Sequence, residues 1–266
     1  MTLLDRPRPA DRVRQVAVVV GTAVAIVGAF LGSGAAGGTP IQNAADGAFG
    51  PDATLLAPAV PAFSIWSVIY LGLIAYAVRQ ALPRQASRAV HRSIGWWVLG
   101  SALLNAAWIL VVQAGSLPLS LVVIAVLLAV LVTILARLRS RRRSGWIDAL
   151  VIDGTMGLYL GWVLIATVAD ATAVLVRAGF TGAGIDPGVW GVLVLCVAGV
   201  IAVALAVWDR GRLAPAIATA WGCFWIGIAR ATGTLASTPV AVTAFVVAGA
   251  ILVAALAVRL TSRRRA

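Results

Sequence analysis

The chain contains no lysine and no glutamate. All 21 of its basic residues are arginine, all nine acidic residues are aspartate, and charged residues fill only 11% of its 266 positions. Soluble domains carry roughly 25% charged residues, whereas 61% of this sequence is hydrophobic and its mean hydropathy is +1.00. This scarcity of charge excludes an ordinary soluble domain and indicates an integral membrane protein.

Side chains that bind metals or act as nucleophiles are also scarce. The two cysteines, Cys196 and Cys223, both lie in apolar runs, so we expect no disulfide framework and no metal site. The single histidine, His91, follows a basic stretch, and we expect it to be a solvated loop residue. Because no catalytic triad or phosphate-binding loop is present either, we expect the protein not to be an enzyme and to have no certain cofactor.

Eight apolar runs are long enough to cross a bilayer, which takes about 20 residues each. They lie at residues 15–33, 60–79, 95–113, 117–136, 148–170, 188–208, 213–230 and 239–260. The sequence therefore predicts an all-α fold, a polytopic membrane helix bundle of about eight helices. The pairs "GAFLG" (28–32) and "GLYLG" (157–161) have the G-x-x-x-G spacing that lets membrane helices approach closely.

The arginines are distributed unevenly among the connections between these runs. If the connections alternate between the two sides, 19 arginines fall on the side of the N-terminus, and only Arg177 and Arg230 fall on the other. Short cytoplasmic loops are enriched in arginine, so we predict that both termini are cytoplasmic in a bacterial cytoplasmic membrane. On this interpretation the arginines determine the orientation of the chain in the membrane, and they do not indicate nucleic-acid binding. We expect the first run to be retained, since it exceeds the 7–15 apolar residues of a signal peptide.

Five of the ten tryptophans lie near the ends of these runs, where tryptophan is a normal interfacial anchor. With the predicted topology, three of the deeper ones, Trp66, Trp108 and Trp162, reach the same depth in the outer half of the bilayer. Trp66, for example, lies about 10 Å from the outer end of its helix, at 1.5 Å per residue. Three tryptophans from three helices therefore converge.

Polar residues accompany these tryptophans on the same helices. Asn105 precedes Trp108 by three residues, while Tyr159, Ala166 and Asp170 share one helical stripe with Trp162. An unpaired amide in hydrocarbon costs several kcal/mol, so Asn105 needs a partner. Two interpretations stay open: helix packing with Asn105 as a hydrogen-bond clamp, or the wall of a binding site.

Asp153 lies about one turn inside the cytoplasmic end of the fifth run. We expect it to pair with an arginine of an inner loop, with a proton or ion relay as the alternative.

Three stretches resemble the TspO/MBR family, the translocator proteins also called tryptophan-rich sensory proteins. The second helix of that family carries F-x-x-V-W-x-x-L-Y, and Phe63, Trp66 and Tyr70 in "FSIWSVIY" match it with a one-residue shift. Its third helix carries L-N-x-x-W, which Asn105 and Trp108 match in "LNAAW".

The fifth helix of the family carries Y-L-A-W-V-x-F-A-x-x-x-N. The stretch "YLGWVLIATVAD" matches it without gaps at Tyr159, Trp162 and Ala166, while Asp170 stands where the family usually has Asn. The loop signature W-x-P-P before the second helix is degenerate here, reading "LLAPAVPAF".

The resemblance implies a five-helix bundle that binds hydrophobic ligands, notably porphyrins and in some members sterols, under a roof formed by the first loop. We expect residues 1–175 to form this bundle and residues 176–266 to add a three-helix region with a basic tail. The expected ligand site comprises Phe63, Trp66, Tyr70, Asn105, Trp108, Tyr159, Trp162, Ala166 and Asp170.

A tetrapyrrole or sterol-like small molecule and the bilayer are the expected partners, and a homodimer is among the expected assemblies. The alternatives are a proton-coupled small-molecule transporter, for which Asp153 and Asp170 are the candidate acids, and, ranked lowest, an enzyme acting on a lipid-soluble substrate.

Overall fold

The computed structural model describes residues 7–34, 36–139, 141 and 145–264, and all regular structure in these ranges is helical. The helices are α1 (Pro9–Gly32), α2 (Ala44–Gly47), α3 (Ile65–Ala81), α4 (Ala89–Gln113), α5 (Leu117–Arg139), α6 (Trp146–Asp148), α7 (Thr155–Arg177), α8 (Pro187–Trp208), α9 (Leu213–Thr232) and α10 (Thr238–Arg264). Within the described residues, eight segments are long and apolar enough to span a membrane. They confirm the predicted helical membrane bundle.

Short helical turns complete two of these spans. The 3₁₀ turn η3 (Val60–Ser64) leads into α3, and the π-helical turn η5 (Ala149–Gly154) joins α6 to α7. Further 3₁₀ turns, η2 (Ile41–Asn43) and η4 (Pro83–Gln85), lie in the connections. In hydrocarbon every backbone N–H and C=O needs a partner within its own segment, which is why the apolar runs are helical throughout.

The prediction for His91 was wrong. Helix α4 begins at Ala89, six residues before the apolar run, and carries His91 into the bundle, where its side chain is fully buried. One ring nitrogen lies 3.5 Å from the Tyr76 hydroxyl and the other 3.2 Å from Gln85 Oε1. A helix continues through polar residues that end a hydropathy run, because its backbone hydrogen bonds do not depend on side-chain polarity.

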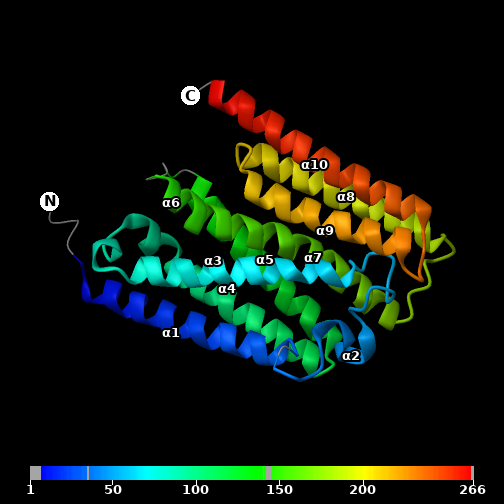
Figure 1. Ribbon diagram of the computed structural model, residues 1–266, viewed down its shortest axis with the longest axis horizontal. Coiled ribbons are helices and arrows are strands. Elements are labelled where there is room, and N and C mark those ends of the chain that lie inside the picture. The colour runs from blue at the N-terminus through cyan, green and yellow to red at the C-terminus, as the bar shows by residue number, and fades with distance from the viewer. Residues whose placement is uncertain (1–6, 35, 140, 142–144, 265–266) are drawn as a thin grey trace.

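Helix α4 packs between α1 and α5, and α5 packs against α7, while α8, α9 and α10 form a group joined to α7 by α9 (Figure 1). Both predicted G-x-x-x-G pairs lie at helix contacts. A Cβ atom on Gly161 would lie 2.2 Å from the Pro215 carbonyl oxygen of α9, and one on Gly32 would lie 2.6 Å from Ile109 of α4. At these contacts the absence of a side chain lets the two helices pack closely.

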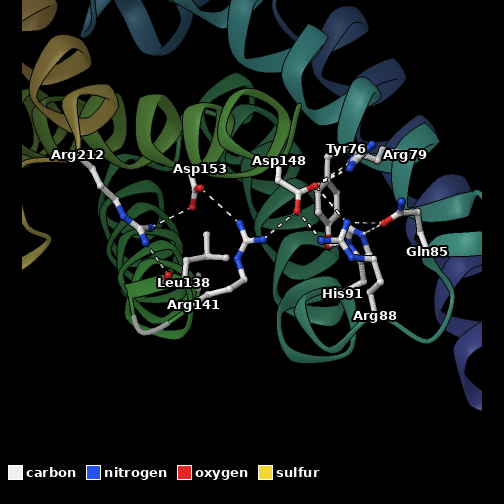
Figure 2. Close-up of polar contacts among 10 residues, drawn as sticks. All are labelled: Tyr76, Arg79, Gln85, Arg88, His91, Leu138, Arg141, Asp148, Asp153 and Arg212. Atoms are coloured by element: carbon white, nitrogen blue, oxygen red, sulfur yellow. Dashed lines mark hydrogen bonds and ion pairs between the residues drawn. The ribbon is translucent and has the colours of Figure 1, made fainter. Parts of the chain in front are cut away.

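The bundle has two chemically distinct ends. The first turn of α1 and the last turns of α10 lie at one of them, which we call the terminal end, and the segment around α2 lies at the other, which we call the loop end (Figure 1). The terminal end carries an ion-pair network (Figure 2). Its two aspartates, Asp148 and Asp153, are buried and share Arg141, whose guanidinium nitrogens lie 3.2 and 3.4 Å from their respective carboxylates.

Further arginines complete this network. Asp148 also accepts from Arg79 and Arg88, each at 2.6 Å, and Asp153 pairs with Arg212 at 3.1 Å. The predicted ion pair of Asp153 with an arginine of a connecting loop is therefore confirmed. Residues five apart on an α-helix point about 140° away from each other, whereas an i→i+5 turn returns the chain to nearly the same side. The π-helical turn thus helps both carboxylates reach Arg141.

Candidate ligand-binding site

The aromatic residues of the predicted site meet near the loop end of the bundle. The Trp66 ring stacks on Tyr70 with 5.3 Å between centroids, and its other neighbours are Trp162 at 6.3 Å and Tyr159 at 5.8 Å, both edge-on. Phe63 contacts Trp162 edge-on at 5.8 Å. These side chains come from the continuous segment of η3 and α3 and from α7, so two stretches far apart in sequence build one cluster.

Two small adjoining cavities lie within this cluster. Their volumes are about 30 and 20 Å³, and both are lined by Phe63, Trp108, Trp162 and Ala166. Trp66 and Asn105 line the smaller one. Six of the nine predicted site residues therefore border the cavities, and the site is nearly closed.

The other three predicted residues, Tyr70, Tyr159 and Asp170, are hydrogen-bonded to neighbouring helices. The Tyr70 hydroxyl accepts from Asn105 Nδ2 at 2.9 Å, and the Tyr159 hydroxyl donates to the Ser101 carbonyl at 3.0 Å. The expected partner for the Asn105 amide thus exists.

Asp170 joins three helices from a fully buried position on α7. Its carboxylate accepts from the Trp108 indole nitrogen of α4 at 2.8 Å and from the Ser120 hydroxyl of α5 at 2.9 Å. Asp170 therefore fixes the orientation of a tryptophan that lines both cavities.

Two polar atoms in the cluster have no hydrogen-bond partner among the described residues. They are the amide oxygen of Asn105, an acceptor, and the indole nitrogen of Trp162, a donor, and both are buried. Both residues line the smaller cavity. Almost all buried polar groups in proteins are hydrogen-bonded, so these two atoms are exceptions, and both belong to residues that line the same cavity.

The loop between α1 and α3 roofs the larger cavity, as the resemblance implied. Ala48, Thr54, Ala57 and Pro58 line it from above, and Phe49 contacts the Trp108 ring edge-on at 5.6 Å. The sequence showed no individual signal for these residues, because the loop is rich in alanine and glycine without periodicity.

One helix that lines the smaller cavity was not predicted from the sequence. Ile124 and Leu127 of α5 line the smaller cavity. Since α5 is apolar on all sides, no periodic pattern distinguishes its cavity-facing residues from those that face lipid.

Helix α9 contacts the chain on both sides of Pro61. The Trp221 indole nitrogen donates to the Ala62 carbonyl at 2.9 Å, and the Ala59 N–H donates to the Trp225 carbonyl at 3.1 Å. These bonds connect the C-terminal helices directly to the segment that leads into α3.

A buried arginine makes a second connection between α9 and the roof. The Arg230 guanidinium donates to the Pro51 carbonyl and, at 2.7 Å, to the Leu235 carbonyl. Asp52 lies 3.8 Å from it, and hydrogen bonds from the Thr234 side chain and the Leu235 N–H hold the pKa of Asp52 below its ordinary value. The roof is thus tied to the turn between α9 and α10.

A family model described as TSPO-like protein matches residues 15–257. The match extends past residue 175 through α8 and α9 and into α10, so it includes the helices that hold the roof. No curated protein and no solved structure matches the chain. Since the model covers most of the sequence, the chain belongs to the family of TSPO-like proteins.

Proposed function

We propose that this membrane protein binds a flat hydrophobic ligand of porphyrin type between its aromatic side chains. The observation that carries the proposal is the buried pair formed by the Asn105 amide oxygen and the Trp162 indole N–H. Leaving a buried polar group unpaired costs about 1–3 kcal/mol. A ligand that offers both a donor and an acceptor removes this cost for both groups.

The chemistry of the walls favours a flat ring over other hydrophobic shapes. Trp66 and Trp162 present large π surfaces, on which an aromatic macrocycle can stack or against which it can lie edge-on. A porphyrin also carries pyrrole N–H donors and unprotonated nitrogen acceptors. A sterol offers only one hydroxyl and no aromatic face, so we rank it second.

Binding requires the closed site to open. Pockets for small molecules usually measure about 300–1,000 Å³, whereas the two cavities measure about 30 and 20 Å³. The smaller one holds about one water molecule, which could bridge Asn105 and Trp162 until a ligand displaces it. The roof is the wall that can move, because it is a loop rather than a packed helix.

Proton-coupled transport, the alternative, has less support from the contacts. Asp153 is paired with two arginines, and the carboxylate of Asp170 accepts two hydrogen bonds. Each acid therefore has a structural role that accounts for its position.

We also infer that the terminal end faces the cytoplasm, because the arginine-rich connections gather there. With Cys196→Ser and Cys223→Ala as background, a membrane-impermeant maleimide added to intact cells should label Thr181→Cys and not Arg84→Cys. The reverse pattern would overturn this orientation.

The ligand class is tested by titrating the protein in lipid nanodiscs with protoporphyrin IX and, separately, with cholesterol. The proposal predicts saturable quenching of tryptophan fluorescence by the porphyrin. It predicts little displacement of bound porphyrin by the sterol. Absence of saturable porphyrin binding would refute the proposal.

A further inference from the structure

A second and larger cavity lies outside the aromatic cluster, at the loop end between α7 and α8. Its volume is about 200 Å³, and it is enclosed by the roof loop, the last turns of α7 and the first turns of α8. Helix α8 belongs to the part of the chain beyond residue 175, so this cavity exists only because the chain continues past α7.

The connection between α7 and α8 keeps the two helices apart at this point. Trp190 of α8 donates its indole N–H to the Gly182 carbonyl at 2.9 Å and contacts Phe180 edge-on at 5.9 Å. Gly182 has a φ of +90°, a conformation that other residues rarely adopt. Phe180, Gly182 and Trp190 thus form one wall of the cavity.

The rest of the lining is mainly aliphatic and opens toward the lipid. Leu55, Leu175, Val176 and Val194 are among the lining residues, and Leu175 and Val176 are 49% and 51% exposed. In a bilayer such exposed apolar side chains face hydrocarbon, so the mouth of the cavity is continuous with the lipid chains. Flexible alkyl chains fill an irregular aliphatic space better than a rigid ring does.

One polar group in this lining lacks a partner. Thr54 is 5% exposed, and its hydroxyl has no hydrogen-bond partner among the described residues. Thr172, by contrast, donates its hydroxyl to the Val168 carbonyl at 2.8 Å. A buried hydroxyl without a partner in an apolar cavity is unfavourable unless a bound molecule supplies one.

We propose that this cavity binds an alkyl or isoprenoid chain whose hydroxyl or carbonyl group hydrogen-bonds to Thr54. Thr54 also lines the roofed aromatic cavity. One molecule with a ring and a long chain would therefore occupy both sites, a step that rests on the proposed function. Binding of the chain alone does not depend on it.

The test is photolabelling in nanodiscs with a long-chain alcohol that carries a diazirine in mid-chain, followed by peptide mapping. The proposal predicts saturable labelling of Leu175, Val176 or Val194 that excess unlabelled alcohol suppresses. Val194→Trp, which fills the cavity, should reduce this labelling about tenfold, whereas Val197→Trp should not, because Val197 is 58% exposed on the outer face of the same helix.

The role of Thr54 is tested with two substitutions and two competitors. Thr54→Val removes the hydroxyl at constant shape and should weaken competition by the alcohol about three- to tenfold, the range expected for one neutral hydrogen bond. Thr54→Ser should restore it, and the corresponding alkane should compete equally in both variants.

Two results would overturn the proposal. One is non-saturable labelling that is as strong at Val197 as at Val194, which would identify an ordinary lipid contact. The other is alcohol competition that does not change in Thr54→Val. Neither result depends on whether the aromatic site binds a porphyrin.

Discussion

The Trp108 indole nitrogen donates to an Asp170 carboxyl oxygen at 2.8 Å, so an aspartate buried in a membrane helix holds the orientation of an aromatic wall. Asp170→Ala leaves that N–H without its acceptor, whereas the Ser120 hydroxyl keeps the Leu117 carbonyl at 2.8 Å. We expect a loss of about 1–3 kcal/mol in unfolding free energy, measured by SDS-induced unfolding.

Asp170→Asn is the matched control for this prediction. An amide keeps one acceptor oxygen for Trp108, and the Ser120 hydroxyl can rotate to accept from the amide nitrogen. We expect a smaller loss of unfolding free energy than for alanine. Equal stability of the alanine variant and the unmodified protein would contradict the assigned role.

Arg230 fixes the roof, so Arg230→Gln should loosen it. The shorter amide cannot reach both Pro51 and Leu235 carbonyls, and we expect faster proteolysis of the loop and a cost of about 1–3 kcal/mol. Arg177→Gln is the control, because Arg177 pairs with Asp46 on the exposed surface of the same loop, where ion pairs contribute about 0–1 kcal/mol.

The pH dependence of this contact has a definite sign. Because the pKa of Asp52 is lowered, the contribution of Asp52 to the folded loop is present at neutral pH. It is lost only as the pH falls below the ordinary aspartate pKa of ~3.9 and through the lowered value. Loop proteolysis that already accelerates between pH 8 and pH 6 would need another cause.

Gly161→Ala should separate α7 from α9. The added methyl group would lie 2.2 Å from a backbone oxygen that cannot move alone, so we expect a loss of about 1–3 kcal/mol. Gly100→Ala, on α4, meets no atom within 4 Å and should be neutral or slightly stabilising. Similar unfolding midpoints for the two variants would show that α7 and α9 do not pack as described.

Asp148 forms ion pairs with three arginines at the terminal end, so Asp148→Asn should be among the most damaging changes to a single charge. Removing one partner of a buried ion pair costs about 3–5 kcal/mol, and the partial exposure of the arginines places the effect near the lower value. Asp186→Asn is the control, since Asp186 caps α8 from an exposed position and asparagine caps equally well. A drop in unfolding midpoint no larger than that of Asp186→Asn would rule out the network as a stabilising feature.

The convergence of Trp66, Trp108 and Trp162 could be predicted because three constraints agreed: run length, arginine placement and helical periodicity. Ile124 and Phe49 could not be predicted, since a helix apolar on every side has no distinguishable face and an aperiodic loop has no register. The prediction that His91 is solvated failed for a related reason. Hydropathy locates the residues that cross the bilayer core, but it does not locate the ends of a helix. The π-helical turn that helps Asp148 and Asp153 to share Arg141 has no clear sequence signature.

The most direct test of the central claim is porphyrin affinity measured by fluorescence quenching in Trp162→Phe, with Trp97→Phe as the control. Phenylalanine keeps an aromatic ring and removes the unpaired N–H, whereas Trp97 lies on the exposed surface, away from the cavities. The account predicts that Trp162→Phe weakens binding at least threefold and that Trp97→Phe leaves the dissociation constant unchanged. Equal affinities of both variants and the unmodified protein would show that the aromatic cluster is packing and not a binding site.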